Sequence, residues 1–297
     1  FSYFSDDSEN LFSRIEWVKG DINNIPKLER AFKDITSVYH CAAFVSFEPD
    51  KYKTLRKINI EGTANIVNLC ISNKVNKLCY VSSIAAIGQH NDPEKLIDEQ
   101  TSWNPENDNS VYAITKYGAE LEVWRGSQEG LDVVIVNPGI ILGGGFWNGG
   151  SSGNLFKQIK KGMRYYTFGV SGYVDVWDVV NAMNLLMTGI VKNESFILVS
   201  ENLSFKTYQT KTAIALNAQP PNIEAKPWLL HIAWRLDWLG FKILRNRRSL
   251  TKQTAKSTMS VTKYDNSKLK NTLNFEFKPI GESIKEVCNL YLKDLDK

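Results

Sequence analysis

Three side chains in two separate segments of the sequence could together carry out a proton transfer. Ser83 ends an apolar run, Tyr112 follows it by 29 residues, and Lys116 comes four positions later. Because residues four apart share one face of a helix, Tyr112 and Lys116 would point in the same direction. A free tyrosine has a pKa of about 10, and a nearby ammonium together with an oxidised nicotinamide would lower it. The lysine could also hold ribose hydroxyls, and Ser83 would orient a substrate oxygen. This set predicts nicotinamide chemistry.

The Tyr-x-x-x-Lys spacing by itself is weak evidence, because Tyr264 and Lys268 repeat it. No predicted strand directly precedes Tyr264, and we interpret this residue as an aromatic anchor at the start of a short helix. Taken alone, the first set could equally consist of surface residues and strand-end serines. The elements around it therefore have to decide between these interpretations.

Apolar runs alternate with longer amphipathic segments over the first two thirds of the chain. We expect strands at 15–18, 37–41, 77–82 and 131–136, and helices at 25–34, 57–73 and 111–128. Continuous apolar strands between helices are typical of a parallel sheet that is covered on both faces. With right-handed crossovers, this pattern predicts a doubly wound Rossmann fold of the α/β class.

The pattern becomes less regular after residue 138. We expect a mobile glycine-rich loop at 143–153, a helix at 175–190, a strand at 195–200 and a closing helix at 284–295. We assign residues 1–150 to a dinucleotide-binding domain and 151–297 mainly to a smaller C-terminal α/β substrate lobe. The elements around 173–200 would return to the first domain.

Composition excludes several classes of function. The formal net charge is only +4, and no long basic stretch extends beyond Arg245–Arg248, so we expect no nucleic-acid partner. The four cysteines form no Cys-x-x-Cys pair and the three histidines are far apart, so we expect no metal site. We find no secretory signal and no run of 18 apolar residues, which favours a reduced cytoplasmic protein. A homodimer is one possible assembly.

In this setting the chain resembles the extended short-chain dehydrogenase/reductase family, which includes nucleotide-sugar epimerases, dihydroflavonol reductases and 3β-hydroxysteroid dehydrogenases. The amino-acid sequence around Ser83 and that of the C-terminal segments most resemble the dihydroflavonol-reductase-like or epimerase-like branch. Five further segments match family motifs in the expected order: Val18–Ile22, Val38–Ala43, Asn59–Thr63, Asn137–Gly143 and Tyr173–Val179.

The resemblance implies an NAD(P)-dependent oxidoreductase or epimerase. Such an enzyme transfers a hydride between the nicotinamide and a hydroxyl or carbonyl carbon of a small-molecule substrate. It implies catalytic roles for Ser83, Tyr112 as general acid/base, and Lys116. It also implies cofactor contacts, to NAD or NADP, by Asp21, Ile22, Cys41, Ala42, Ala43, Asn59, Ser82, Tyr112, Lys116, Pro138, Gly139, Ile140 and Ile141. The alternative is a non-catalytic dinucleotide-sensing or interaction protein on the same fold, although a sensor would not need all three catalytic residues.

The family begins with a strand, a Gly-x-x-Gly-x-x-Gly turn and a helix that holds the pyrophosphate, and we find no such turn at the start of this chain. The glycines at 143–153 have the wrong spacing and no acidic ribose partner follows them. We expect that about 40–50 residues, one strand–helix–strand unit, are absent. Residues 1–297 alone should then fold poorly and bind dinucleotide weakly. The choice between NAD and NADP would depend on the absent part.

Two further features have alternative interpretations. Segment 228–244 is strongly apolar, with a narrow polar stripe at His231, Arg235 and Lys242. We favour packing within the substrate lobe and no membrane contact; a lid over an apolar substrate or contact with a membrane surface are the alternatives. His40 is expected to end a buried strand with its ring satisfied locally.

Overall fold

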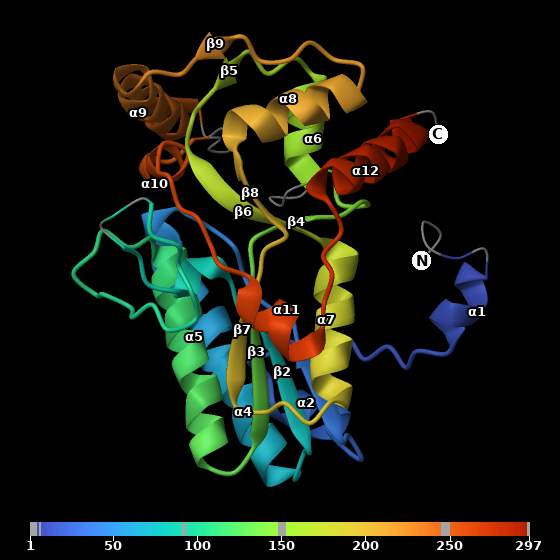
Figure 1. Ribbon diagram of the computed structural model, residues 1–297. Helices are drawn as coiled ribbons and strands as arrows, with labels where there is room; N and C mark the ends of the chain where they lie inside the picture. Colours follow the sequence, from blue (N-terminus) through green and yellow to red (C-terminus); the bar gives the residue numbers. More distant parts are fainter. Residues whose placement is uncertain are drawn as a thin grey trace.

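The computed structural model describes residues 5, 7–90, 92, 94–147, 153–244 and 250–295. Its main sheet contains four parallel strands in the order β1-β2-β3-β7. These are β1 (Ser37–His40), β2 (Lys77–Val81), β3 (Asp132–Pro138) and β7 (Glu194–Leu198). Helices α4 (Gly62–Ser72) and α5 (Val111–Gln128) cover one face of the sheet, and α7 (Val176–Thr188) and α11 (Ser267–Leu273) cover the other (Figure 1). The predicted doubly wound α/β fold is therefore confirmed.

Alternation along the strands creates a separate core on each face of the sheet. In β2, Leu78 and Tyr80 pack with residues of α4 and α5, whereas Cys79 packs with residues of α7 and α11. Side chains of successive strand residues point to opposite faces, so a strand that is buried on both sides must be apolar throughout. This explains why these strands form continuous apolar runs in the sequence.

The segment that enters α4 is continuous but irregular. A 3₁₀ turn, η1 (Pro49–Lys51), leads into α3 (Tyr52–Leu55), a π-helical stretch, η2 (Arg56–Glu61), and then α4. The predicted helix at 57–73 thus exists, with a π segment at its start. Such segments occur frequently at functional sites, and this one carries Asn59.

A second lobe occupies the upper part of Figure 1. It contains a three-stranded sheet in the order β4-β6-β8 and a small parallel pair of β5 with β9. A third core joins this sheet to α6, α8 and α12. Its elements are β4 (Ile140–Leu142), α6 (Gly153–Lys160), β5 (Tyr165–Tyr166), β6 (Val170–Asp175), β8 (Glu201–Ser204), α8 (Phe205–Ala215), β9 (Ile223–Glu224), α9 (Pro227–Leu244), α10 (Lys252–Ser257) and α12 (Ile280–Leu295).

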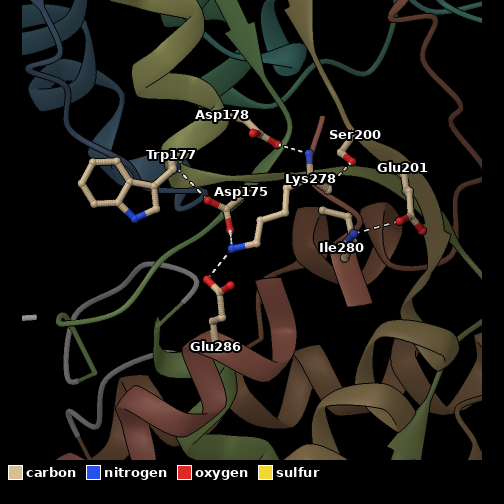
Figure 2. A network of polar contacts seen from close by, with 8 residues as sticks. All are labelled: Asp175, Trp177, Asp178, Ser200, Glu201, Lys278, Ile280 and Glu286. Atoms are coloured by element: carbon tan, nitrogen blue, oxygen red, sulfur yellow. Dashed lines mark hydrogen bonds and ion pairs between the residues drawn. The ribbon is translucent and has the colours of Figure 1, made fainter. Parts of the chain in front are cut away.

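A polar network around Lys278 ties the two lobes together (Figure 2). The Lys278 ammonium bridges Asp175, at 3.9 Å, and Glu286 of α12. Its backbone N–H donates to Asp178 of α7 at 2.9 Å, and its carbonyl accepts from the Ser200 hydroxyl at 2.7 Å. Asp175 also caps α7 by accepting from the Trp177 N–H at 2.8 Å. The segment before α12 is thereby fixed to the start of α7.

One predicted strand is wrong. Residues 15–18 form no strand, and α1 (Ser8–Ser13) precedes them. A strand is stabilised by a paired neighbour, and no described strand pairs with this segment. Trp17 instead stacks on Phe12, with 5.1 Å between the ring centroids. Helix α2 (Ile25–Ala31) follows, close to its predicted position.

Two remaining predictions concern the glycine-rich loop and the membrane. Residues 148–152 of the predicted loop at 143–153 lie outside the described residues, and Gly153 begins α6. Among the described residues, no helix has both the length and the hydropathy required to cross a bilayer.

Candidate active site

The predicted catalytic and nicotinamide-side residues gather at the carboxyl end of the main sheet. Cys41–Ala43 follow β1, Ser82 and Ser83 follow β2, and Pro138 ends β3. The register pairs His40 with Tyr80 and Tyr80 with Ile135, so the carboxyl ends of these strands lie at the same edge of the sheet. In open parallel sheets, ligands bind in the crevice beyond the carboxyl ends of the strands.

Helix α5 brings Tyr112 beside Ser83. The helix begins at Val111 because the Ser110 side chain accepts the Ala113 N–H at 3.0 Å, which places Tyr112 in the first turn. Burial raises the pKa of Tyr112, and the Ser83 hydroxyl partly offsets this by hydrogen bonding. The Phe47 ring packs edge-on against the Tyr112 ring, with 5.5 Å between centroids. Tyr112 is therefore held in its protonated form at neutral pH, next to the serine hydroxyl.

Lys116 lies behind this pair with 1% of its surface exposed. Its Nζ donates to the Tyr80 hydroxyl at 2.6 Å and to the Val81 carbonyl at 2.8 Å. Burial lowers the pKa of Lys116 to about 7, and the nearby Glu120 carboxylate opposes that shift. An ammonium has three donors, so two are used within the protein and one remains.

Lys116 and an oxidised nicotinamide were expected together to lower the pKa of Tyr112, and this stays a prediction. In the protein alone, burial raises that pKa. The Lys116 ammonium is directed at Tyr80 and Val81, and it lies over the Tyr80 ring at 4.3 Å from the centroid.

A buried polar group that was not predicted from the sequence joins α5 to the ends of β2 and β3. The Asn137 side chain donates to Glu120 at 2.6 Å and to the Ser83 carbonyl at 3.1 Å. Burial raises the pKa of Glu120, while the hydrogen bond from Asn137 lowers it. The available signal was spacing, because Glu120 lies four residues after Lys116 and so on the same helix face. This group holds Ser83 in position relative to α5.

Asn59, for which the resemblance implies a cofactor contact, links the segment after β1 to α5. Its side-chain oxygen accepts the Phe44 N–H at 2.8 Å, and its Nδ2 donates to the Phe44 carbonyl at 3.0 Å and to the Thr115 hydroxyl at 3.1 Å. Thr115 in turn donates to the Tyr112 carbonyl at 3.0 Å. With 1% of its surface exposed and both N–H donors used, Asn59 positions the 41–44 segment relative to α5.

Asp21 and Ile22 lie beside η2 and the start of α4. Asp21 lines a shallow hollow together with Lys57, and its exposed carboxylate accepts the Asn23 N–H at 2.8 Å. Ile22 rests on Gly62, where a Cβ would lie 2.9 Å from the isoleucine side chain. The 20–24 turn is therefore packed against the helix that also carries Asn59.

The remaining predicted contacts differ in accessibility. Cys41, Ala42 and Ala43 are exposed, with small side chains that leave the end of β1 open. Pro138 is buried, and Gly139 needs to be glycine because a Cβ there would lie 2.4 Å from the Gly172 carbonyl oxygen. Ile140 and Ile141 form β4, and their side chains pack against the third and second cores respectively. The remaining N–H donor of Lys116 and the open strand ends fit a dinucleotide at this edge of the sheet.

His40 behaves as the sequence predicted. Its Nε2 lies 2.9 Å from the Thr63 hydroxyl, and 3% of its surface is exposed. Burial lowers its pKa to about 4, so the ring is neutral at physiological pH. His40 is a satisfied buried histidine at the end of β1.

The second Tyr-x-x-x-Lys pair is structural. The Tyr264 backbone exchanges two hydrogen bonds of 2.9 Å with the Asn202 side chain. Lys268 pairs with Glu194 at 2.9 Å and donates to the Ser195 carbonyl. Both residues fasten the segment before and within α11 to strands β8 and β7.

A cleft of about 540 Å³ opens beside the first turn of α5. Its walls combine aromatic side chains from two parts of the chain with residues that precede α5. Phe47, which also packs on Tyr112, lies on one side, and Trp234, Trp238 and Phe241 of α9 lie on the other. Helix α9 is thus only partly packed as predicted: one face borders the cleft, but none of the side chains from Pro227 to Ile243 is buried.

Comparison with known proteins agrees with this geometry. The model of an NAD-binding family, described as "Male sterility protein", matches residues 1–182. A putative dihydroflavonol 4-reductase of Synechocystis sp. is 29% identical over 236 residues, which is 77% of this chain and 67% of that protein. Cinnamoyl-CoA reductase 1 of Petunia hybrida is 28% identical over 187 residues, 60% of this chain and 55% of that protein. The chain thus spans between about half and two thirds of these relatives.

Solved structures share the fold over a larger part of the chain. A UDP-glucose 4-epimerase of Thermotoga maritima, solved with UDP-glucose, superposes with a TM-score of 0.78 at 20% identity. The match covers 99% of this chain and 90% of that protein. The structural match shows a shared fold, and the family match shows that the chain belongs to the NAD-binding "Male sterility protein" family.

Proposed function

We propose that this protein is an NAD(P)-dependent oxidoreductase that reduces a carbonyl group, or oxidises the corresponding hydroxyl, on a small molecule with a large apolar part. The carrying observation is the placement of the Tyr112 and Ser83 hydroxyls side by side at the carboxyl edge of the sheet, with Lys116 buried behind them. An epimerase on the same site is the alternative. We favour the reductase because Phe47, Trp234, Trp238 and Phe241 make the adjoining cleft aromatic.

Tyr112 and Ser83 would have separate roles in the reaction. When bound, the nicotinamide would supply or accept the hydride. Tyr112, kept protonated by burial, would donate its hydroxyl proton to the carbonyl oxygen as the carbon receives the hydride. Ser83 would hold that oxygen by a hydrogen bond. In the oxidative direction the same proton would return to Tyr112.

The cofactor would be held by the edge that these strand ends form. Lys116 has one N–H donor left after binding Tyr80 and Val81, and this donor would bind a ribose hydroxyl. Asp21 would accept a hydrogen bond from the adenine side. The further proposed contacts are Ile22, Cys41, Ala42, Ala43, Ser82, Pro138, Gly139, Ile140 and Ile141, with Asn59 positioning the 41–44 segment.

We also propose the domain division near residue 150 and a reduced, cytoplasmic setting. The four cysteines are free thiols, and Cys70, Cys79 and Cys288 are buried. Buried, unpaired cysteines pack as small hydrophobes and are typical of reducing compartments. A homodimer remains a prediction of the sequence.

Tyr112→Phe in the full-length protein tests the proposal. Loss of the proton donor should reduce turnover with a panel of aromatic and aliphatic carbonyl compounds by about 10²- to 10⁴-fold. The affinity for NADH or NADPH should stay within about twofold, since the ring remains. Tyr264→Phe is the matched control, because it alters the structural copy of the motif and should leave turnover unchanged.

Two outcomes would overturn the proposal. Turnover that is unchanged in Tyr112→Phe would remove Tyr112 from the chemistry. A wild-type protein that binds NAD(P)H tightly, yet turns over none of a broad carbonyl panel, would favour the dinucleotide-sensing alternative.

A further inference from the structure

Helix α9 carries an apolar stripe that no described part of the chain covers. Spacings of four, four, three and four residues place its members on one face of the helix. Each of these side chains is between 46% and 69% exposed. The stripe, called here the outer face, consists of Trp228, Ile232, Leu236, Leu239 and Ile243.

The outer face is distinct from the face that borders the cleft. The residues that line the cleft are Trp234, Trp238 and Phe241, and they lie on a different side of the helix from the outer face. In Figure 1, α9 stands at the margin of the upper lobe next to α10. A monomer in water seldom leaves a contiguous stripe of five large apolar side chains exposed, so this face is expected to have an occupant.

A basic ridge separates the two faces. The ridge consists of His231, Arg235 and Lys242. At about 100 degrees per residue, these residues lie 40 to 80 degrees around the helix from Pro227, which places them on the border of the outer face. The Arg235 guanidinium lies 4.5 Å from the Trp234 ring centroid, and the Lys242 ammonium lies 4.6 Å from that of Trp238. An apolar helix face that includes a tryptophan, here Trp228, and is bordered by cationic groups is characteristic of helices at a membrane–water interface.

Charge is concentrated in the same segment. Residues 226–252 contain seven lysines and arginines and one acidic residue, a net charge of +6, whereas the whole chain carries only +4. The rest of the chain therefore has a net charge of −2. An apolar stripe within a sequence segment of this net charge, bordered by Arg235 and Lys242, is complementary to a surface that is apolar inside and anionic outside.

We propose that the outer face of α9 docks on the surface of an anionic lipid bilayer. The apolar stripe would enter the boundary between headgroups and acyl chains, and the basic ridge would bind the anionic headgroups. A second copy of the chain suits this face less well. Two α9 helices related by a twofold axis would bring two basic ridges together, and Asp237 is the only acidic residue on the helix.

Flotation of the full-length protein with lipid vesicles tests this proposal without requiring turnover. The protein should float with vesicles of phosphatidylcholine and phosphatidylserine, and less with phosphatidylcholine alone or at high salt. Leu236→Glu should reduce binding by at least about tenfold, and the double variant Arg235→Gln with Lys242→Gln by at least about threefold. Ile214→Glu on α8 is the matched control, because Ile214 is 63% exposed and Leu236 is 62% exposed. This control should float as the wild type does.

Thermal melting and NAD(P)H binding in the same samples establish that each variant is folded. A wild-type protein that does not float, or equal loss in Leu236→Glu and Ile214→Glu, would overturn the proposal. A wild-type dimer in sedimentation analysis that Leu236→Glu dissociates, without vesicle binding, would instead assign the outer face to a second copy of the chain.

Discussion

Replacing Asn59 by leucine removes the side chain that links the end of β1 to the helix carrying Tyr112. Leucine has the same number of side-chain heavy atoms with the same branching, so the change deletes hydrogen bonds without opening a cavity. Three bonds are lost: one from the Phe44 N–H, one to the Phe44 carbonyl and one to the Thr115 hydroxyl. The cofactor-side segment 41–44 would lose its attachment to η2.

The cost can be worked out from these partners. Thr115 keeps its bond to the Tyr112 carbonyl, so its loss matters least. The two Phe44 backbone groups are left without a partner, at about 1–3 kcal/mol each. We therefore expect a loss of about 3 kcal/mol in the free energy of unfolding, and a fall in Tm of about 6–12 °C for a chain of this size. We also expect at least about tenfold weaker NAD(P)H binding, because the segment is no longer preorganised.

Urea unfolding of the full-length protein and fluorescence titration with NAD(P)H measure the two effects. Asn68→Leu is the matched control, since Asn68 is exposed on α4 and accepts a bond from the Arg125 side chain. It should change stability by less than about 0.5 kcal/mol. If Asn59→Leu matched the wild type in both assays, Asn59 would not organise the site.

Two further predictions concern stability. Lys77 donates to the carbonyls of Leu186, Gly189 and Val191 at the end of α7, at 2.5, 3.1 and 2.5 Å, so Lys77→Met should cost about 3 kcal/mol in urea unfolding. Lys192→Met, which removes an exposed ion pair with Asp132, should cost less than about 1 kcal/mol, and equal losses would contradict the capping role of Lys77. Burial raises the pKa of Asp178 to about 6 from 3.8. The folded state therefore holds this proton more tightly than the unfolded state, and the ionised carboxylate lowers stability above about pH 6. Asp178→Asn should raise Tm at pH 8 and lose this advantage by pH 4; an advantage that is the same at both values would refute the assignment.

Local pattern was enough to predict much of the fold and the convergence of the catalytic set. Helix α5 was expected at 111–128 and begins at Val111, because the Ser110 cap and the residue pattern both act within a few positions. Ser83 and Tyr112 come together because β2 and the start of α5 both lie at the carboxyl edge of a parallel sheet. These relations depend on the order of elements, which the sequence reveals.

Relations that depend on tertiary packing were missed or wrong. The direction of the Lys116 ammonium is decided by Tyr80 and Val81, and Tyr80 is 36 residues away in the sequence. The strand expected at 15–18 has the right apolar pattern, but a pattern does not supply a partner strand. Helix α9 was expected to pack in the lobe because it is apolar on most sides. Only the fold shows which of its faces borders the cleft and which is exposed.

Transfer of deuterium from the reduced cofactor to a substrate carbon tests the central claim most directly. The full-length protein and its Tyr112→Phe variant would be incubated with NADH or NADPH deuterated at the nicotinamide C4 and a panel of apolar carbonyl compounds, and the products analysed by mass spectrometry. We predict deuterium at the former carbonyl carbon with the wild type, and a loss of about 10²-fold or more with Tyr112→Phe at unchanged cofactor affinity. Cofactor binding without deuterium transfer by the wild type, or equal transfer by both proteins, would contradict the account.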